Sequence, residues 1–199
     1  MDDIVKQAMA KWPNVPWCYG WLALDARGAW RMRDEATQRQ DAPGDKLNSA
    51  ALVGFINRNY QHDERGCWYF QNGPQRVYVN LETTPFIART DPAQGLVLHT
   101  GQALGDPDEV FLTEAGAIVL RTADTVAQVD DRDVAQLLQA LELDGRPASD
   151  EGLMAWLEGG SGVLALRLGG KRVPVGRLGA DEAPVRFGFV QRPDRLADT

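Results

Sequence analysis

Cysteine and histidine are scarce in this chain. Its 199 residues include two cysteines, Cys18 and Cys67, and two histidines, His62 and His99. Two cysteines build no disulfide framework, and both lie in aromatic, strand-like runs, so we expect buried free thiols in a reducing compartment. A zinc site needs about four converging ligands. The candidate ligands in the run from His62 to Cys67 all lie along one polar turn, where they are not expected to converge on an ion. We therefore predict no metal and no other cofactor.

Long hydrophobic runs are also absent. No stretch approaches the ~18 apolar residues of a membrane helix. The first four residues, MDDI, contain no basic region of the kind that opens a secretory signal. We therefore predict a cytoplasmic location and no membrane partner.

Basic side chains are outnumbered by acidic ones. The chain holds 21 Lys and Arg against 28 Asp and Glu, a net charge of −7, which disfavours contact with phosphate backbones. We expect no nucleic-acid partner. The excess lies in residues 106–151, which hold 12 acidic and 3 basic side chains. This stretch predicts a solvated acidic face, although it could also recruit a basic partner or cations.

Catalytic motifs are missing as well. None of the three serines lies in a G-x-S-x-G sequence, and residues 159–162 (GGSG) follow a predicted helix, whereas a phosphate-binding loop precedes one. Cys67 and His99 could act together only if the fold brings them into contact. The aromatic neighbours of Cys67 favour a buried, inert thiol. We assign no catalytic residue and lean against an enzyme.

The remaining composition is that of a folded globular protein, with 44% hydrophobic and 25% charged residues. Helical periodicity predicts helices over residues 2–12, 47–60, 131–143 and 150–158. Alternating patterns around glycine turns predict hairpins over residues 17–33, 67–81, 110–121 and 163–178. A loop is expected over residues 34–46, and single strands over residues 86–89, 96–99 and 185–190.

An internal repeat relates the two halves of the sequence. A shift of 96 residues aligns, without gaps, the series Gly66, Gly73, Arg76, Val77 and Val79 with Gly162, Gly169, Arg172, Val173 and Val175. A shift of 88 residues aligns Leu24, Gly28, Ala29 and Arg33 with Leu112, Gly116, Ala117 and Arg121. Glycine turns make all hairpins look alike, but the ungapped series and the shared element order indicate a duplication.

The repeat predicts the fold class and the domains. We expect an α+β protein of two tandem similar lobes, residues 1–103 and 104–199, each with short antiparallel hairpins packed against a helix. The order hairpin, helix, hairpin, strand would occur twice, with an additional helix at 150–158 in the second lobe. Any ligand groove is expected between the lobes.

Several of these segments resemble a known family. The run Gly28-Ala29-Trp30, the hairpin 67–81 and residues 81–88 (LETTPFIA) are similar to the uncharacterised proteobacterial family called domain of unknown function 1285. Thr83 and Thr84 stand where that family favours an acidic pair, which suggests a sister family. The resemblance implies duplicated α+β motifs and a suggested role in signal transduction, and it carries over no functional residue.

Aromatic residues are concentrated at one end of the chain, where twelve of the sixteen lie within residues 1–90. Core packing explains part of this excess. The rest could form an exposed patch for a partner or a flat ligand, with nearby arginines adding cation–π or anion contacts. The candidate binding residues are Trp17, Tyr19, Trp21, Trp30, Trp68, Arg31, Arg76 and Arg89.

These observations favour a non-catalytic regulatory or signalling interaction module. Its partner would be another protein or a second copy of the chain, since exposed sheet edges on both lobes make dimerisation plausible. The alternative is a small-molecule-binding protein or an enzyme with an unrecognised site between the lobes.

Overall fold

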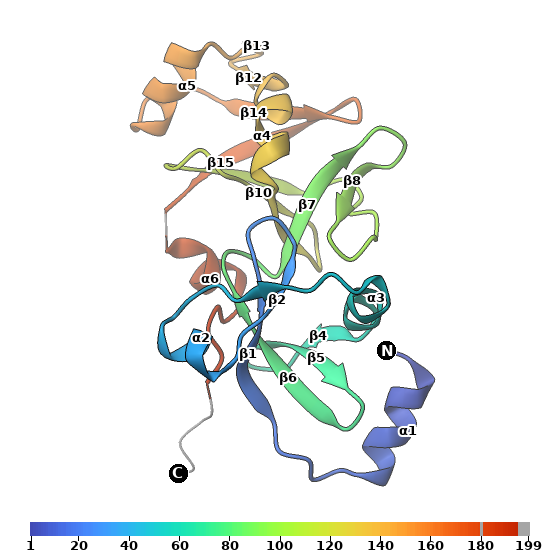
Figure 1. Cartoon of the computed structure of the whole chain (residues 1–199). Helices are drawn as coiled ribbons and strands as arrows, with labels where there is room; N and C mark the ends of the chain where they lie inside the picture. Colours follow the sequence, from blue (N-terminus) through green and yellow to red (C-terminus); the bar gives the residue numbers. More distant parts are fainter. Residues whose placement is uncertain (180, 195–199) are drawn as a thin grey trace. The chain divides into compact units, whose positions relative to one another are not determined.

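The computed structural model describes residues 1–179 and 181–194. It separates into two compact units, shown in Figure 1. Unit 1 comprises Met1–Pro85 together with the segment from Gly188 on, and unit 2 comprises Phe86–Phe187. Within the described residues, no helix is long and apolar enough to cross a membrane.

Unit 1 is a six-stranded sheet with three helices. The helices are α1 (Asp3–Lys11), α2 (Glu35–Arg39) and α3 (Ala50–Arg58). The strands are β1 (Cys18–Leu24), β2 (Trp30–Met32), β3 (Asp45–Lys46), β4 (Tyr60–His62), β5 (Trp68–Asn72) and β6 (Gln75–Leu81). Their order across the sheet is β3-β2-β1-β6-β5-β4, with β1 and β6 parallel and the other pairs antiparallel.

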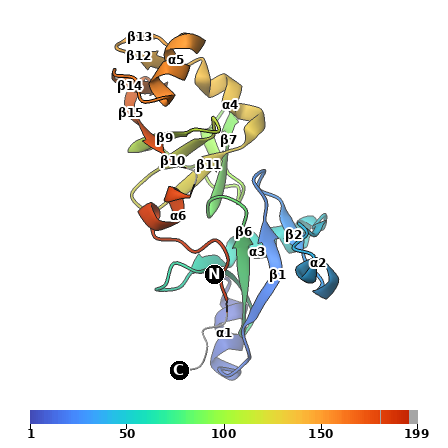
Figure 2. The same cartoon turned by 90° about the vertical axis from the view of Figure 1, so that its left-hand side faces the viewer.

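Unit 2 is a nine-stranded sheet with three helices. The helices are α4 (Asp131–Leu138), α5 (Asp150–Leu157) and α6 (Glu182–Phe187). The strands are β7 (Phe86–Asp91), β8 (Gly95–Leu98), β9 (Glu109–Thr113), β10 (Ile118–Arg121), β11 (Val126–Val129), β12 (Leu141–Leu143), β13 (Arg146–Pro147), β14 (Leu164–Leu168) and β15 (Lys171–Leu178). Their order is β13-β12-β14-β15-β9-β10-β11-β7-β8, and Figures 1 and 2 both show α5 beside β12 and β13. The fold is therefore mixed α+β, as predicted.

The two sheets share a six-strand order. The series β3-β2-β1-β6-β5-β4 of unit 1 has the same strand directions as β11-β10-β9-β15-β14-β12 of unit 2. The register agrees as well. Leu24 lies opposite Leu81 on the parallel strands of unit 1. Leu112 and Arg177, which follow these residues by 88 and 96 positions, lie opposite each other in unit 2.

The structure divides the chain at different points from the sequence analysis, which placed a boundary after residue 103. The hairpin β7–β8 belongs to unit 2 because β7 pairs in parallel with β11, from Phe86 opposite Ala127 to Ala88 opposite Val129. The chain thus enters unit 2 at Phe86 and leaves it after Phe187. Such long-range pairing has no local sequence signal.

Local sequence explains the hairpins and helix starts near the candidate site. In the β1–β2 turn, the Asp25 side chain accepts hydrogen bonds from the backbone N–H groups of Arg27 and Ala29, at 3.0 and 2.8 Å. Asp and Asn close turns in this way because a short carboxylate or amide reaches the backbone two residues on. Ser49 caps α3 by accepting from the Leu52 N–H, the usual role of a serine directly before a helix.

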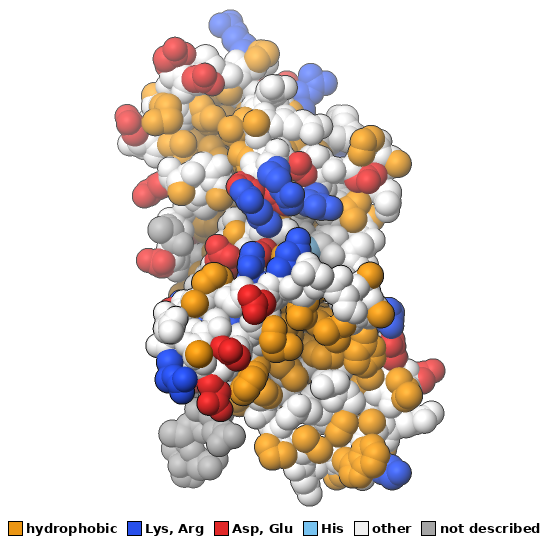
Figure 3. All heavy atoms as spheres, viewed as in Figure 1, with side chains coloured by type: hydrophobic (Ala, Val, Ile, Leu, Met, Phe, Trp, Pro, Cys, Tyr) orange, Lys and Arg blue, Asp and Glu red, His pale blue; other side chains and the backbone are white. Residues whose placement is uncertain are grey.

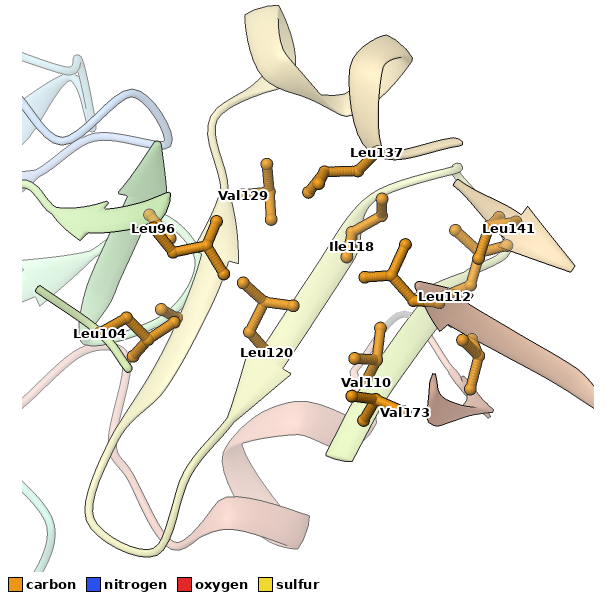
Figure 4. Packing of buried hydrophobic residues seen from close by; sticks show 14 of the residues in the cluster. Leu96, Leu104, Val110, Leu112, Ile118, Leu120, Val129, Leu137, Leu141 and Val173 are labelled. Atoms are coloured by element: carbon orange, nitrogen blue, oxygen red, sulfur yellow. The ribbon is translucent and has the colours of Figure 1, made fainter. Parts of the chain in front are cut away.

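The core of unit 2 lies between its sheet and the helices α4 and α5. Figure 4 shows Leu112, Ile118 and Leu120 of the central strands close to Leu137 of α4 and Val129 of β11. Each of these five side chains is at most 4% exposed. Leu137 of α4 therefore faces the core, with Val134 and Leu138 packed against it, as expected of the apolar side of an amphipathic helix.

Three local predictions were wrong. Helix α4 ends at Leu138, not 143, because Leu141–Leu143 instead pairs with β14 as strand β12. A strand was expected over residues 185–190, but residues 185–187 belong to helix α6 (Glu182–Phe187). Pro184 suits the first turn of a helix, and Glu182 pairs with Arg186 at 2.8 Å. The expected loop 34–46 contains α2 and β3.

The C-terminal segment (residues 188–194) lies against the β4–β5 turn and the end of β6. The Val190 N–H donates to the Gly66 carbonyl at 3.0 Å, and the Leu81 N–H donates to the Gln191 carbonyl at 2.8 Å. Gly66 has a φ of 77°, and a Cβ atom there would lie 2.1 Å from the Gly188 carbonyl oxygen. Only glycine permits this close approach.

Candidate functional site

One face of the unit 1 sheet carries a group of aromatic rings in mutual contact and an arginine. We call it the aromatic–arginine cluster, and its members are Trp17, Tyr19, Tyr69, Tyr78 and Arg76. Antiparallel pairing of β5 and β6 places Tyr69 opposite Tyr78, with ring centroids 5.5 Å apart. Tyr19 of β1 stacks on Tyr78 at 4.6 Å, with the ring planes 3° apart.

Arg76 fixes the outer part of the cluster. Its guanidinium lies 5.1 Å from the Trp17 ring centroid and 4.6 Å from that of Tyr69. Trp17 also meets Tyr78 edge-on at 5.8 Å. Trp17, which directly precedes β1, nevertheless remains 47% exposed, and Trp21 of β1 is 39% exposed. The cluster therefore combines buried tyrosines with an exposed indole and a positioned cation.

Asp63 anchors the inner side of the cluster. Its carboxylate accepts hydrogen bonds from the Tyr78 hydroxyl and from the backbone N–H groups of Arg65 and Cys67, all at 3.0 Å. Burial raises the pKa of the Asp63 carboxyl, but these hydrogen bonds together outweigh burial, so the pKa lies below its ordinary value. Asp63 is therefore ionised at neutral pH and holds Tyr78 in place.

Two predicted site residues, Trp30 and Trp68, point to the opposite face of the sheet. Trp30 is 2% exposed and meets Tyr60 edge-on at 5.0 Å. Its indole N–H donates to the Asn57 side chain at 2.7 Å. Trp68 packs on Tyr60 at 4.8 Å. Because α3 covers this face, with Phe55 5.4 Å from Phe70, Trp30 belongs to the core and Trp68 lies beside it.

Exposed aliphatic residues flank that covered face. Met32 of β2 is 42% exposed and Leu52 of α3 is 37% exposed. Figure 3 shows hydrophobic side chains gathered over the region that α3, β2 and β4 occupy in Figure 1. Met32 pairs with Leu22 and lies on the Trp30 side of the sheet, opposite the aromatic–arginine cluster, so these residues do not extend that cluster.

The three arginines that were predicted as binding residues lie in three different parts of the structure. Arg76 belongs to the aromatic–arginine cluster, whereas Arg89 is exposed on β7 in unit 2. Arg31 lines a cavity of about 200 Å3 in unit 1, which we call the arginine pocket. The charged residues that line it are Arg31, Arg33, Arg192, Asp25, Asp41 and Glu82.

The arginine pocket lies on the same sheet face as the aromatic–arginine cluster. Arg31 is opposite Ala23 on β1, which is opposite Asn80 on β6, and Tyr78 precedes Asn80 by two residues. Residues two apart on a strand share a face. Sequence reasoning missed Asp41 and Arg192 as site residues, because only the docked C-terminal segment brings Arg192 to this pocket, 2.9 Å from Asp41.

The structure gives little support for covalent or metal chemistry. Burial, followed by the nearby Asp63 charge, raises the pKa of the Cys67 thiol and disfavours the reactive thiolate. Cys67 lies in unit 1 and His99 in unit 2. Across the part of the chain that the structure describes, no group of three or more His, Cys, Asp or Glu residues is arranged to hold a metal ion.

Comparison with known proteins places the chain in a family. The family model DUF2944, described as "Protein of unknown function (DUF2946)", matches residues 1–194. No curated protein matches the chain. The crystal structure of a DUF1285 family protein from Silicibacter pomeroyi DSS-3 is similar, with 16% sequence identity, a TM-score of 0.48, and coverage of 81% of this chain and 82% of that chain. The chain therefore belongs to the DUF2944 family, a family of proteins of unknown function.

Proposed function

We propose that this protein is a non-catalytic regulatory interaction module that binds a protein partner through the aromatic–arginine cluster. The observation that carries the proposal is Arg76 stacked beside an indole that is 47% exposed. Tryptophan, tyrosine and arginine dominate the binding energy of protein interfaces when they lie together. The cluster is also pre-organised, which lowers the entropy cost of binding.

The chemistry of the cluster favours an acidic segment of the partner. A guanidinium stacked on aromatic rings still presents N–H groups in its plane to a carboxylate. The neighbouring Arg65 guanidinium lies 5.8 Å from the Tyr78 ring. The one carboxylate of the cluster's inner side, Asp63, pairs with Arg65 at 3.1 Å and also accepts from the Tyr78 hydroxyl. Arg76 therefore remains as the positive charge where a partner would bind.

The proposal is tested by capture of partners on the tagged full-length chain from cells that express it natively, followed by direct titration of the purified partner. Trp17→Ala and Arg76→Ala are each expected to weaken binding about tenfold or more, as loss of an interface hot spot does. Binding is also expected to weaken as salt rises, because a charged pair contributes to it.

The matched control is Met154→Ala, since Met154 is an exposed apolar residue of unit 2 (57%) outside the cluster. This variant should bind like the unmodified chain. A partner that binds the Trp17 and Arg76 variants with unchanged affinity would contradict the proposal. A second copy of the chain is a possible partner, which sedimentation of the same variants detects.

We also propose that the chain arose by duplication of one α+β module. The shared order of six strands and the pairing of Leu24–Leu81 and Leu112–Arg177 at shifts of 88 and 96 residues support this. In this interpretation α3 and α4 correspond, and α5 is the additional helix of the second copy. A cytoplasmic location is proposed because both cysteines are free.

Small-molecule binding is a second candidate function. It is favoured by the arginine pocket within unit 1 and is argued below.

A further inference from the structure

The arginine pocket has the chemistry of an anion site. We infer that it binds a small oxyanion, either a carboxylate or a phosphate, through Arg31, Arg33 and Arg192. This inference is independent of the proposed protein interface, because it depends on different side chains.

The inference depends mainly on the burial of Arg33. Its side chain is 7% exposed, yet its carboxylate partner Asp41 is 58% exposed. A buried charge is costly unless it is paired and hydrogen-bonded. Arg33 donates from Nε to the Ala42 carbonyl at 3.0 Å and from Nη2 to Asp41 at 2.9 Å. A guanidinium that is buried beside a cavity, while its counter-ion is exposed, is suited to take an anion as a further partner.

The pocket holds three guanidiniums and three carboxylates, and the guanidiniums keep N–H groups that these carboxylates do not engage. Each guanidinium has five N–H groups. Arg31 donates to Asp25 at 2.7 Å and to the Gly44 carbonyl at 3.2 Å, and Arg192 donates to Asp41 at 2.9 Å. Most N–H groups of the three arginines therefore take no part in the hydrogen bonds between the described residues.

Two of the three carboxylates of the pocket, Asp25 and Asp41, are paired with its guanidiniums. Asp25 accepts from the Arg27 and Ala29 N–H groups and from Arg31. Asp41 lies between Arg33 and Arg192, and the Arg192 hydrogen bond above all lowers the pKa of its carboxyl. Glu82 accepts from the Ala26 N–H at 3.0 Å and is exposed. The N–H groups that these carboxylates do not engage call for a ligand that is rich in acceptors and planar or tetrahedral, as carboxylates and phosphates are.

The size of the pocket limits the ligand. Its volume of about 200 Å3 lies below the ~300 Å3 at which drug-sized pockets begin. Leu24, Leu81 and Pro43 form an apolar part of the lining. Inorganic phosphate or a short organic acid such as succinate has the right size and acceptors.

The ligand would also tie the C-terminal segment to unit 1. Arg192 belongs to that segment, which is otherwise docked by backbone hydrogen bonds at Gly66 and Leu81. A ligand that binds only the docked state stabilises it by mass action. Slower hydrogen exchange of the Val190 and Leu81 N–H groups is therefore expected when the site is occupied.

The test titrates the full-length chain with sodium phosphate and, separately, with sodium succinate, at constant ionic strength in a chloride buffer. Calorimetry and the thermal unfolding midpoint report binding, and the two titrations distinguish a phosphate from a carboxylate ligand. Arg192→Ala and Arg31→Gln are each expected to weaken binding about tenfold, the effect of losing charge-assisted hydrogen bonds.

Two further variants separate binding from structural effects. Glu82→Gln keeps an acceptor for the Ala26 N–H but removes a negative charge from the pocket, so it should strengthen anion binding about twofold. Arg167→Ala, which removes an exposed arginine paired with Glu142 in unit 2 at 3.4 Å, should leave binding unchanged.

The inference is overturned if neither anion binds at millimolar concentration. It is also overturned if Arg192→Ala, with its unliganded unfolding midpoint retained, binds as tightly as the unmodified chain. Weaker binding by Glu82→Gln would likewise contradict it.

Discussion

Asp130 is the clearest case in which a single residue's charge matters for stability. Its side chain is fully buried at the start of α4 and accepts hydrogen bonds from the backbone and the guanidinium of Arg132. These bonds, the guanidinium's above all, lower the pKa of the Asp130 carboxyl to about 2. Ionisation of Asp130 is therefore more favourable in the folded chain than in the unfolded chain, so the charge stabilises the fold.

We predict that Asp130→Asn lowers the free energy of unfolding by about 1–2 kcal/mol at pH 7, because asparagine retains the helix cap but loses the charge. The folded pKa lies below the unfolded value of about 3.9. The stabilisation is thus complete above pH ~4 and is lost as pH falls towards the folded pKa of about 2. Urea unfolding at pH 7, 4 and 3 measures the difference.

The control is Asp3→Asn, because the Asp3 side chain is 86% exposed and should contribute within about 0.5 kcal/mol. A difference between the Asp130 variant and the unmodified chain that stays constant from pH 7 to pH 3 would refute the assignment.

At the residue scale, the sequence identified members of the site but not the sheet face on which each of them lies. Trp17, Tyr19 and Arg76 were predicted together, and the structure brings all three to Tyr78 or Tyr69. Trp30 was placed in the same patch but lies on the opposite face, 2% exposed. Alternation identifies which residues share a face, but not which face a helix will cover.

At the scale of elements, the loop between α2 and β3 forms one wall of the arginine pocket. Gly44 in this loop has a φ of 86°, and a Cβ atom there would lie 2.3 Å from the Met32 carbonyl oxygen. Its own carbonyl accepts from Arg31. The loop therefore depends on glycine at this position for its close contact with β2.

We predict that Gly44→Ala destabilises unit 1 by about 1–3 kcal/mol, since alanine adds both strain at positive φ and a clash. It should also weaken anion binding, because the Arg31 contact moves. Thermal unfolding and the phosphate titration check both effects. Gly73→Ala is the comparison, because Gly73 has a φ of 56° but its nearest neighbour to an added Cβ is 3.8 Å away. Equal losses in the two variants would show that the clash is unimportant.

At the scale of the whole molecule, the chain crosses between its units twice, and its last part completes unit 1. Phe189 is 5% exposed, and Val190 packs against Cys67, Tyr69 and Tyr78. The same segment supplies Arg192 to the arginine pocket. Unit 1 is therefore continuous in space although its two parts lie about a hundred residues apart in sequence.

We predict that deleting residues 188–199 exposes the Cys67 thiol, which is 3% exposed in the complete chain. In a Cys18→Ser background, reaction of Cys67 with a thiol reagent should accelerate ~tenfold or more, because the deletion removes the contacts that cover it. The same chain with Cys67→Ser gives the background rate. Unchanged reactivity would show that the segment does not protect unit 1.

Sequence patterns alone were sufficient for the α+β class, the four hairpins, most helix positions and the 88- and 96-residue shifts, because these depend on periodicity and turn chemistry within a few residues. Tertiary structure decided the rest. Three features depend on contacts between distant segments: the pairing of β7 with β11, the strand at Leu141–Leu143, and the position of Arg192 beside Asp41. The free energy of these contacts comes from the distant segment against which each element packs, and the local sequence does not encode that segment.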